Sequence, residues 1–148
     1  MKNKIVDSHC HLDFDDYNND LDSVIHNAKL NDVEYLLSIS VNLEKFKNIH
    51  DITKKYKNVW CTTGIHPNNV PQNISDDKFD SIIEQLEENI NKPKVVGLGE
   101  TGLDYFRESD NKQNQIKFLI NRVKELEDKL LQMQMNEQCG FQVSHGIW

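Results

Sequence analysis

Residues 76–104, DDKFDSIIEQLEENINKPKVVGLGETGLD, decide the fold because they form one helix-and-strand unit. Apolar side chains recur every three or four residues in the first part of this stretch, which predicts an amphipathic helix. Ser75 or Asp76 can cap its start. Pro93 stops the helix, and the apolar run Lys94–Leu98 is typical of a buried parallel strand. The stretch therefore predicts a helix followed by a strand that ends in glycines and carboxylates.

Similar units recur along the first 126 residues, which is the pattern of βα units over a parallel sheet. The expected strands are Lys4–Asp7, Glu34–Val41, Val59–Ile65 and Lys94–Leu98. The expected helices lie at about residues 21–28, 46–56, 79–90 and 112–135. Four units make either an open doubly wound sheet or half of a (β/α)₈ barrel, and the usual barrel length of about 250 residues slightly favours the open sheet.

Composition limits the classes of function. A chain of 148 residues has room for one domain. Its net charge of −7 at pH 7 argues against a broad basic surface for nucleic acid, so a phosphate substrate must meet a local cation. The three cysteines are far apart, and no apolar leader or membrane-spanning stretch is visible. We therefore expect a reduced, cytoplasmic protein with no membrane segment.

Polar side chains follow three of the four expected strands. His9 and His11 lie at the end of the first strand and project to one side, about 7 Å apart. His66 follows the third strand, and Glu100 and Asp104 follow the fourth. Because parallel strands bring their carboxyl ends to one rim, these side chains are expected to converge there. Imidazole and carboxylate suit divalent metal ions, and two such ions about 3.5–4 Å apart are a standard arrangement for cleaving phosphoesters.

Each motif also has a plainer interpretation. Two histidines after a strand are often surface residues in a loop. Glu100 and Asp104 can instead pair with lysines or Arg107 in a solvated loop. His26 and His50 stand on expected helices, and we predict that both are surface residues.

At these residues the sequence resembles the TatD-like deoxyribonucleases, metal-dependent hydrolases built on amidohydrolase-like (β/α)₈ barrels. The motifs DSHCHLD at Asp7–Asp13, GIHP at Gly64–Pro67 and GETGLDY at Gly99–Tyr105 occur in the order and spacing of that family. Gln115 and Phe118 resemble its next helix. The resemblance covers roughly residues 4–126 and implies the first four βα units of a TIM-type barrel, with a domain at residues 1–126.

The resemblance also implies roles for the site residues. His9 and His11 would bind one metal ion together with Glu100, and Glu100 would bridge to a second ion. His66 would face the substrate phosphate, and Asp104 would support the site. The implied cofactors are two divalent ions (Mg, Mn or Zn), and the implied activity is cleavage of phosphodiester bonds in DNA.

The family's second-half metal ligands cannot be assigned here. His145 is the only later histidine, and no strand precedes it. Residues 127–148 are interpreted as a divergent helix extension and tail, such as a frameshift or a misjoined gene model would produce. We therefore expect weak or absent turnover, and self-association through exposed strand edges. The alternatives are an inactive fragment or interaction module, and another amidohydrolase-type activity on amides or lactones.

Overall fold

The structure is a computed structural model, and it describes residues 4–17, 19–104, 106, 111–120 and 124. The strands are β1 (Ile5–Cys10), β2 (Val33–Ser38), β3 (Val59–Thr63) and β4 (Val95–Leu98). The α-helices are α1 (Leu21–Leu30), α2 (Phe46–Lys55) and α3 (Asp76–Ile90), and the 3₁₀ turns are η1 (Asp15–Tyr17) and η2 (Pro67–Asn69). Residues 112–120 are also helical.

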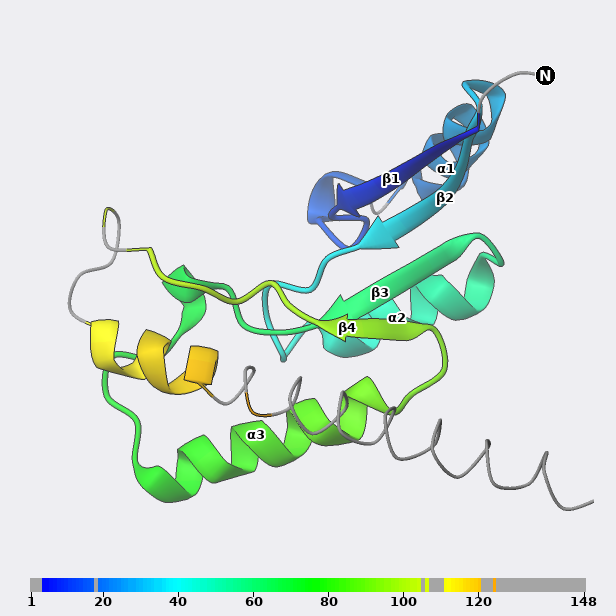
Figure 1. The fold of residues 1–148 in the computed structure, drawn as a ribbon. Helices are drawn as coiled ribbons and strands as arrows, with labels where there is room; N and C mark the ends of the chain where they lie inside the picture. Colours follow the sequence, from blue (N-terminus) through cyan, green and yellow to red (C-terminus); the bar gives the residue numbers. More distant parts are fainter. Residues whose placement is uncertain (1–3, 18, 105, 107–110, 121–123, 125–148) are drawn as a thin grey trace, which may run out of the picture.

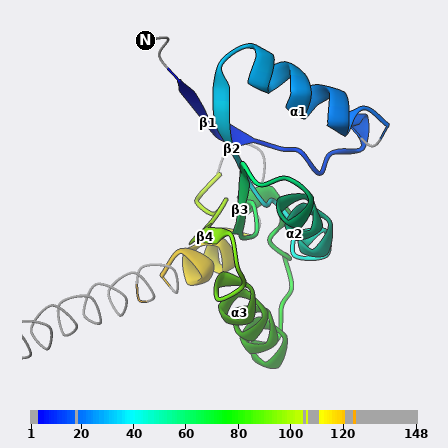
Figure 2. The same ribbon diagram turned by 90° about the vertical axis from the view of Figure 1, so that its right-hand side faces the viewer.

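The order of the strands decides between the two predicted architectures. All neighbouring strands are parallel, and the order β1-β2-β3-β4 follows the sequence. A doubly wound sheet would reverse this order at a switch point. Helices α1 and α2 lie behind the strands in Figure 1 and to one side of the sheet in Figure 2. The fold is therefore that of the first βα units of a TIM-type barrel, and the open doubly wound alternative is wrong.

The outer face of the sheet is covered by helices. Leu36 and Val59 point outward and pack with Ile25 of α1. Farther along, Ile49 of α2 and Cys61 of β3 are fully buried together. Burying an aliphatic side chain of this kind stabilises the fold by about 1.5–3 kcal/mol. The outward-pointing side chains of the strands thus pack against the helices and hold them to the sheet.

Two side chains secure helix ends. The Ser75 hydroxyl accepts the N–H of Lys78 at 3.4 Å, which caps α3 as the sequence predicts. At the carboxyl-terminal end of α2, the Lys94 ammonium donates to the carbonyl oxygens of Thr53 at 2.6 Å and Tyr56 at 2.7 Å. These carbonyls lie where a helix runs out of its own donors. Lys94 therefore ties the end of α2 to the start of β4.

One expectation about the helices is wrong. His50 is buried, with its side chain stacked on Phe46 at a centroid distance of 5.5 Å and its Nε2 atom 3.1 Å from the carbonyl oxygen of Pro93. The loop before β4 supplies this cover, and a helical pattern alone cannot reveal it. His26 is exposed, as expected. The expected helix from about residue 112 agrees with the structure as far as residue 120, whereas its extension to residue 135 and the tail at 127–148 lie outside the described residues.

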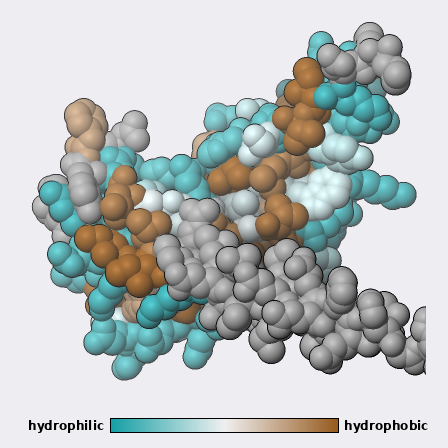
Figure 3. All heavy atoms as spheres, viewed as in Figure 1, coloured by the Kyte–Doolittle hydropathy of each residue, from teal (hydrophilic) through white to brown (hydrophobic). Residues whose placement is uncertain are grey.

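The inner face of the sheet carries apolar side chains that no helix covers in the described part of the chain. A hollow of about 460 Å³ on this face is lined by residues of all four strands, with the side chain of Leu36 turned to the helices instead: Val6, Tyr35, Leu36, Leu37, Trp60 and Val96. Val6 is 59% exposed and Val96 57%. Figure 3 shows apolar patches over the strands on this side. Within the described ranges, no helix is long and apolar enough to cross a bilayer.

Candidate metal centre

Predicted site residues from three strands meet at the carboxyl-terminal rim of the sheet. His9 lies within β1, which extends further than predicted, and His11 follows it. His66 follows β3, and Glu100 follows β4. The ligand atoms of His9, His11 and Glu100 all lie within 4.8 Å of one another. The structure therefore brings together the three residues that the sequence singles out as metal ligands.

The position of Glu100 depends on a crossing of main chains. The N–H of Gly99 donates to the carbonyl of Thr63 at 2.7 Å, and the N–H of Glu100 donates to the carbonyl of Ser40 at 2.8 Å. To reach Ser40, the segment after β4 passes directly over Gly64. A Cβ atom on Gly64 would stand 2.3 Å from the carbonyl carbon of Gly99. Only glycine fits at this crossing.

The two carboxylate oxygens of Glu100 face different histidines. Oε2 lies 3.7 Å from His9 Nε2, and Oε1 lies 3.6 Å from His66 Nε2. Both separations exceed a normal hydrogen bond. The Glu100 side chain is 32% exposed and that of His66 is 23% exposed, so solvent or a ligand reaches both.

Hydrogen bonding prepares His11 to be a ligand. Its Nδ1 atom lies 3.0 Å from the carbonyl oxygen of Ile39. A carbonyl oxygen only accepts, so Nδ1 carries the ring proton and Nε2 keeps a free lone pair. The Phe14 ring stacks on the imidazole at 4.7 Å with an angle of 9°, which fixes the ring plane. His11 can therefore offer the Nε2 lone pair to a metal ion.

His66 has the opposite arrangement. The N–H of Asn68 donates to His66 Nδ1 at 3.1 Å, so the neutral ring carries its proton on Nε2. That proton points toward Glu100 Oε1. The His66 main-chain N–H donates to the carbonyl of Val41 at 3.0 Å, which anchors the residue to the segment after β2. His66 is thus a hydrogen-bond donor for an anion, and not a ready metal ligand.

The donor set fits a divalent ion. Ligand atoms at 2.0–2.2 Å from one ion stand about 3–4 Å from each other, and the His9 to Glu100 separation of 3.7 Å is within that range. Two imidazole nitrogens and a carboxylate suit zinc or manganese. His9 is 56% exposed, which leaves open coordination positions toward solvent.

The two thiols in the described part of the chain, those of Cys10 and Cys61, are not among the three converging side chains. Burial raises the pKa of both Cys10 and Cys61 to about 12. Both are free cysteines. A thiol needs to lose its proton to act as a nucleophile or metal ligand. Both side chains are therefore protonated at neutral pH and serve as packing groups.

Asp104 is close to the site but is not one of the three converging side chains. Its N–H donates to Gln115 Oε1 at 2.9 Å, and its carboxylate accepts the N–H of Phe106 at 3.1 Å. A supporting role for Asp104 stays a prediction. Sequence reasoning missed Ser40 and Asn111, because both act through main-chain contacts with segments distant in sequence.

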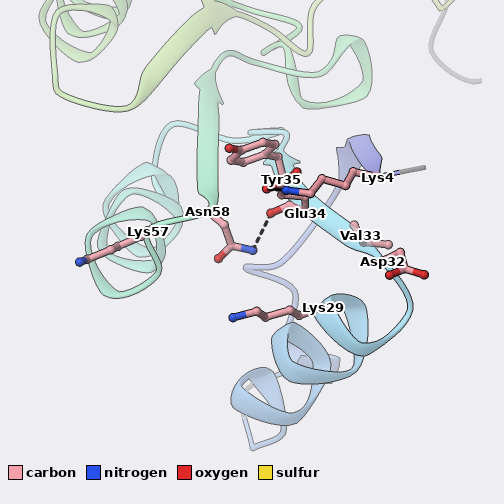
Figure 4. A pocket seen from close by; sticks show the side chains of 8 residues that line it. All are labelled: Lys4, Lys29, Asp32, Val33, Glu34, Tyr35, Lys57 and Asn58. Carbon is pink, nitrogen blue, oxygen red and sulfur yellow. Dashed lines mark hydrogen bonds and ion pairs between the residues drawn. The ribbon is translucent and has the colours of Figure 1, made fainter. Parts of the chain in front are cut away.

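The two larger hollows lie away from the rim. One is the inner-face hollow, and the other, of about 430 Å³, opens at the amino-terminal ends of β2 and β3 (Figure 4). The second contains an ion pair between Lys4 and Glu34, and the Asn58 amide donates to the main-chain carbonyl of Glu34 at 3.2 Å. In barrels of this class that end of the sheet contributes to stability, whereas the carboxyl-terminal rim carries the chemistry.

Known proteins are similar to this chain in sequence and in fold. The chain is 38% identical over 114 residues to an uncharacterized metal-dependent hydrolase of Buchnera aphidicola subsp. Baizongia pistaciae, covering 75% of this chain and 41% of the relative. It is 34% identical over 122 residues to the uncharacterized metal-dependent hydrolase YcfH of Escherichia coli K12, covering 80% and 43%. The crystal structure of YjjV, a TatD homologue from the same organism, superposes with a TM-score of 0.69 at 26% identity, over 81% of this chain and 45% of YjjV.

The chain thus spans less than half the length of these relatives. The family model described as TatD related DNase matches residues 6–127, a range that contains all four residues at the rim and the strands apart from Ile5, the first residue of β1. The resemblance carried by the three motifs is confirmed, and the chain belongs to the family of TatD related DNases.

Proposed function

We propose that this chain carries the metal-binding first half of a hydrolase that cleaves phosphodiester bonds in DNA. The observation that carries the proposal is the meeting of His9, His11 and Glu100 at one rim, beside a histidine that presents a proton. The family's description as DNases supports DNA as the substrate. A metal centre would supply the local cation that a chain of net charge −7 needs to hold a phosphate.

The chain's own residues would divide the work. His9 and His11 would hold a first divalent ion through nitrogen lone pairs, together with the Glu100 carboxylate. The Nε2–H group of His66 would donate a hydrogen bond to a phosphate oxygen. This bond would stabilise the negative charge that develops on the phosphate in the transition state. When bound, divalent ions of this kind neutralise phosphate charge and make water more acidic.

A second divalent ion is part of the proposal. Glu100 directs its two oxygens to different sides, Oε2 toward His9 and Oε1 toward His66. Glu100 would therefore be the residue that helps to hold both ions. Magnesium, manganese and zinc are the candidates, because all three accept carboxylate oxygen.

Hydrolysis of single-stranded DNA by the purified chain tests the proposal. Because the second-half metal ligands are not assigned, we expect at most slow nucleotide release with magnesium, manganese or zinc, and a further loss of at least about 100-fold in Glu100→Gln, which keeps the shape and removes the charge. Equal traces of activity in both proteins would contradict the proposal and favour the inactive fragment or interaction module. Faster hydrolysis of cyclic amides or lactones than of DNA would favour the other amidohydrolase-type activity.

We further infer that a second copy of the chain covers the inner face. Each copy leaves β1 and β4 paired on one side only among the described strands. Pairing β4 of one copy with β1 of the other keeps all strands parallel and is satisfied twice by one twofold axis. One copy matches 45% of the solved relative, so two copies supply close to one barrel.

A reduced, cytoplasmic setting is also proposed, since Cys10 and Cys61 are free.

Sedimentation at increasing concentration tests this association. Val96 is 57% exposed on the inner face, and Leu30 is 65% exposed at the end of α1 on the outer side. We expect the wild-type chain and Leu30→Asp to associate, and Val96→Asp to remain a monomer, because pairing would bury its charge. A wild-type chain that stays monomeric at every concentration would contradict the proposal.

A further inference from the structure

Two buried amides lie beside the loops that carry His66 and Glu100. Asn111 and Gln115 are 2% and 0% exposed. The Gln115 Nε2 donates to Asn111 Oδ1 at 2.6 Å, so the two side chains form one unit. Burying an amide is costly unless its hydrogen bonds are made. The remaining partners of this pair therefore fix where it sits.

One set of partners belongs to the His66 loop. Asn111 Nδ2 and Gln115 Nε2 both donate to the carbonyl oxygen of Pro67, at 3.2 and 3.4 Å. Pro67 follows His66 directly, and the next residue, Asn68, is the one whose N–H sets the His66 tautomer. The amide pair thus anchors the peptide group beside the histidine that presents the proton.

The other partner belongs to the Glu100 loop. Gln115 Oε1 accepts the N–H of Asp104 at 2.9 Å, four residues after Glu100. We propose that Gln115, held by Asn111, is a positioning residue that sets the distance and orientation of His66 relative to Glu100. This inference rests on the proposed function, in which both residues act on one phosphate.

Nitrogen-15 NMR of the His66 ring, recorded on the whole chain without metal or DNA, tests the proposal. Gln115→Met keeps a similar volume and removes both the donor and the acceptor. We expect the wild-type ring to show the Nε2-protonated tautomer, and Gln115→Met to shift both ring signals toward a mixture of tautomers, because Asn68 no longer stays in line. In DNA hydrolysis the same variant should lower kcat at least about tenfold and leave metal affinity unchanged.

Asn114→Leu is the matched control. Asn114 lies on the same helical segment, and its amide donates to the carbonyls of Pro71 at 2.7 Å and Gln72 at 2.9 Å, farther along the connection to α3 and beyond the turn η2 that follows His66. A general loss of helix packing would affect this variant too. We expect it to leave the His66 ring signals at their wild-type positions.

Asn111→Leu separates the two anchors and guards against a Gln115 variant that does not fold. It removes the donor to the carbonyls of Pro67 and Val70, at 3.2 and 2.8 Å, together with the oxygen that accepts from Gln115 Nε2. It keeps the Gln115 oxygen that accepts the N–H of Asp104. We expect shifted His66 signals with an unchanged Asp104 amide signal. Unchanged His66 signals in folded Asn111→Leu or Gln115→Met, or equal shifts in the Asn114 control, would overturn the proposal. Since no metal or DNA is present, a failure of hydrolysis would leave this result standing.

Discussion

Replacing Gly64 with alanine is expected to lower the free energy of unfolding by about 3 kcal/mol and to abolish metal binding. The new Cβ would stand 2.3 Å from the carbonyl carbon of Gly99 and 2.8 Å from the amide nitrogen of Glu100. Both atoms belong to the main chain, so no side-chain rotation relieves the overlap. The segment would have to lift away from Ser40, and Glu100 would leave the two histidines. Urea unfolding followed by circular dichroism and calorimetric titration with manganese measure the two effects.

Gly97→Ala is the matched control for this prediction. Gly97 lies in β4, three residues before Glu100, and the nearest atom to its added Cβ is a methyl carbon of Thr62 at 3.9 Å. That is an ordinary van der Waals contact, so we expect a free energy of unfolding within about 0.5 kcal/mol of wild type. Equal destabilisation by both alanines would show that the crossing over Gly64 is not the cause.

Exchanging Glu100 for glutamine is expected to weaken zinc or manganese binding by at least about 100-fold. Glutamine keeps the size of the side chain but loses the negative charge that faces His9 Nε2 at 3.7 Å. His11→Gln should have a comparable effect, because the Nε2 lone pair left free by the bond to Ile39 is lost. Calorimetric titration with the metal alone measures these affinities independently of any turnover.

His66→Gln is the comparison that makes this series informative. In the wild-type chain, His66 Nδ1 accepts the N–H of Asn68 and His66 Nε2 carries a proton, so neither nitrogen has a lone pair to offer a metal ion. We therefore expect the metal affinity of His66→Gln to stay at the wild-type value. The same variant should slow DNA hydrolysis, since a donor to the phosphate is altered. A loss of metal affinity as large as that of Glu100→Gln would identify His66 as a ligand and contradict the tautomer assigned here.

Much of the fold follows from short-range patterns. The apolar runs place all four strands within a few residues, and Ser75 caps α3 as its side chain and position predict. Convergence of His9, His11 and Glu100 follows from one further rule, that parallel strands bring their carboxyl ends together. These features depend on alternation and direction, which a sequence displays.

Other features depend on contacts between distant segments. No local pattern shows that Glu100 donates its N–H to Ser40 across Gly64, or that Pro93 covers His50. Asn111 looks like an ordinary polar residue at the start of a helix, yet its amide donates to the distant carbonyls of Pro67 and Val70. Composition and periodicity carry no record of such pairings, so sequence reasoning finds the candidate ligands and misses the contacts that position them.

The order β1-β2-β3-β4 also has a consequence for synthesis on the ribosome. Each strand pairs with the one made just before it, so a nascent chain can add strands one at a time without waiting for distant segments. The set of candidate ligands at the rim is completed only after β4, because Glu100 follows that strand. When β3 has just emerged from the ribosome, His9 and His11 have already been made, but Glu100 has not. In the proposed function, metal binding during translation would have to wait for Glu100, and the alignment of Glu100 with His66 would have to wait for the helical segment that carries Gln115.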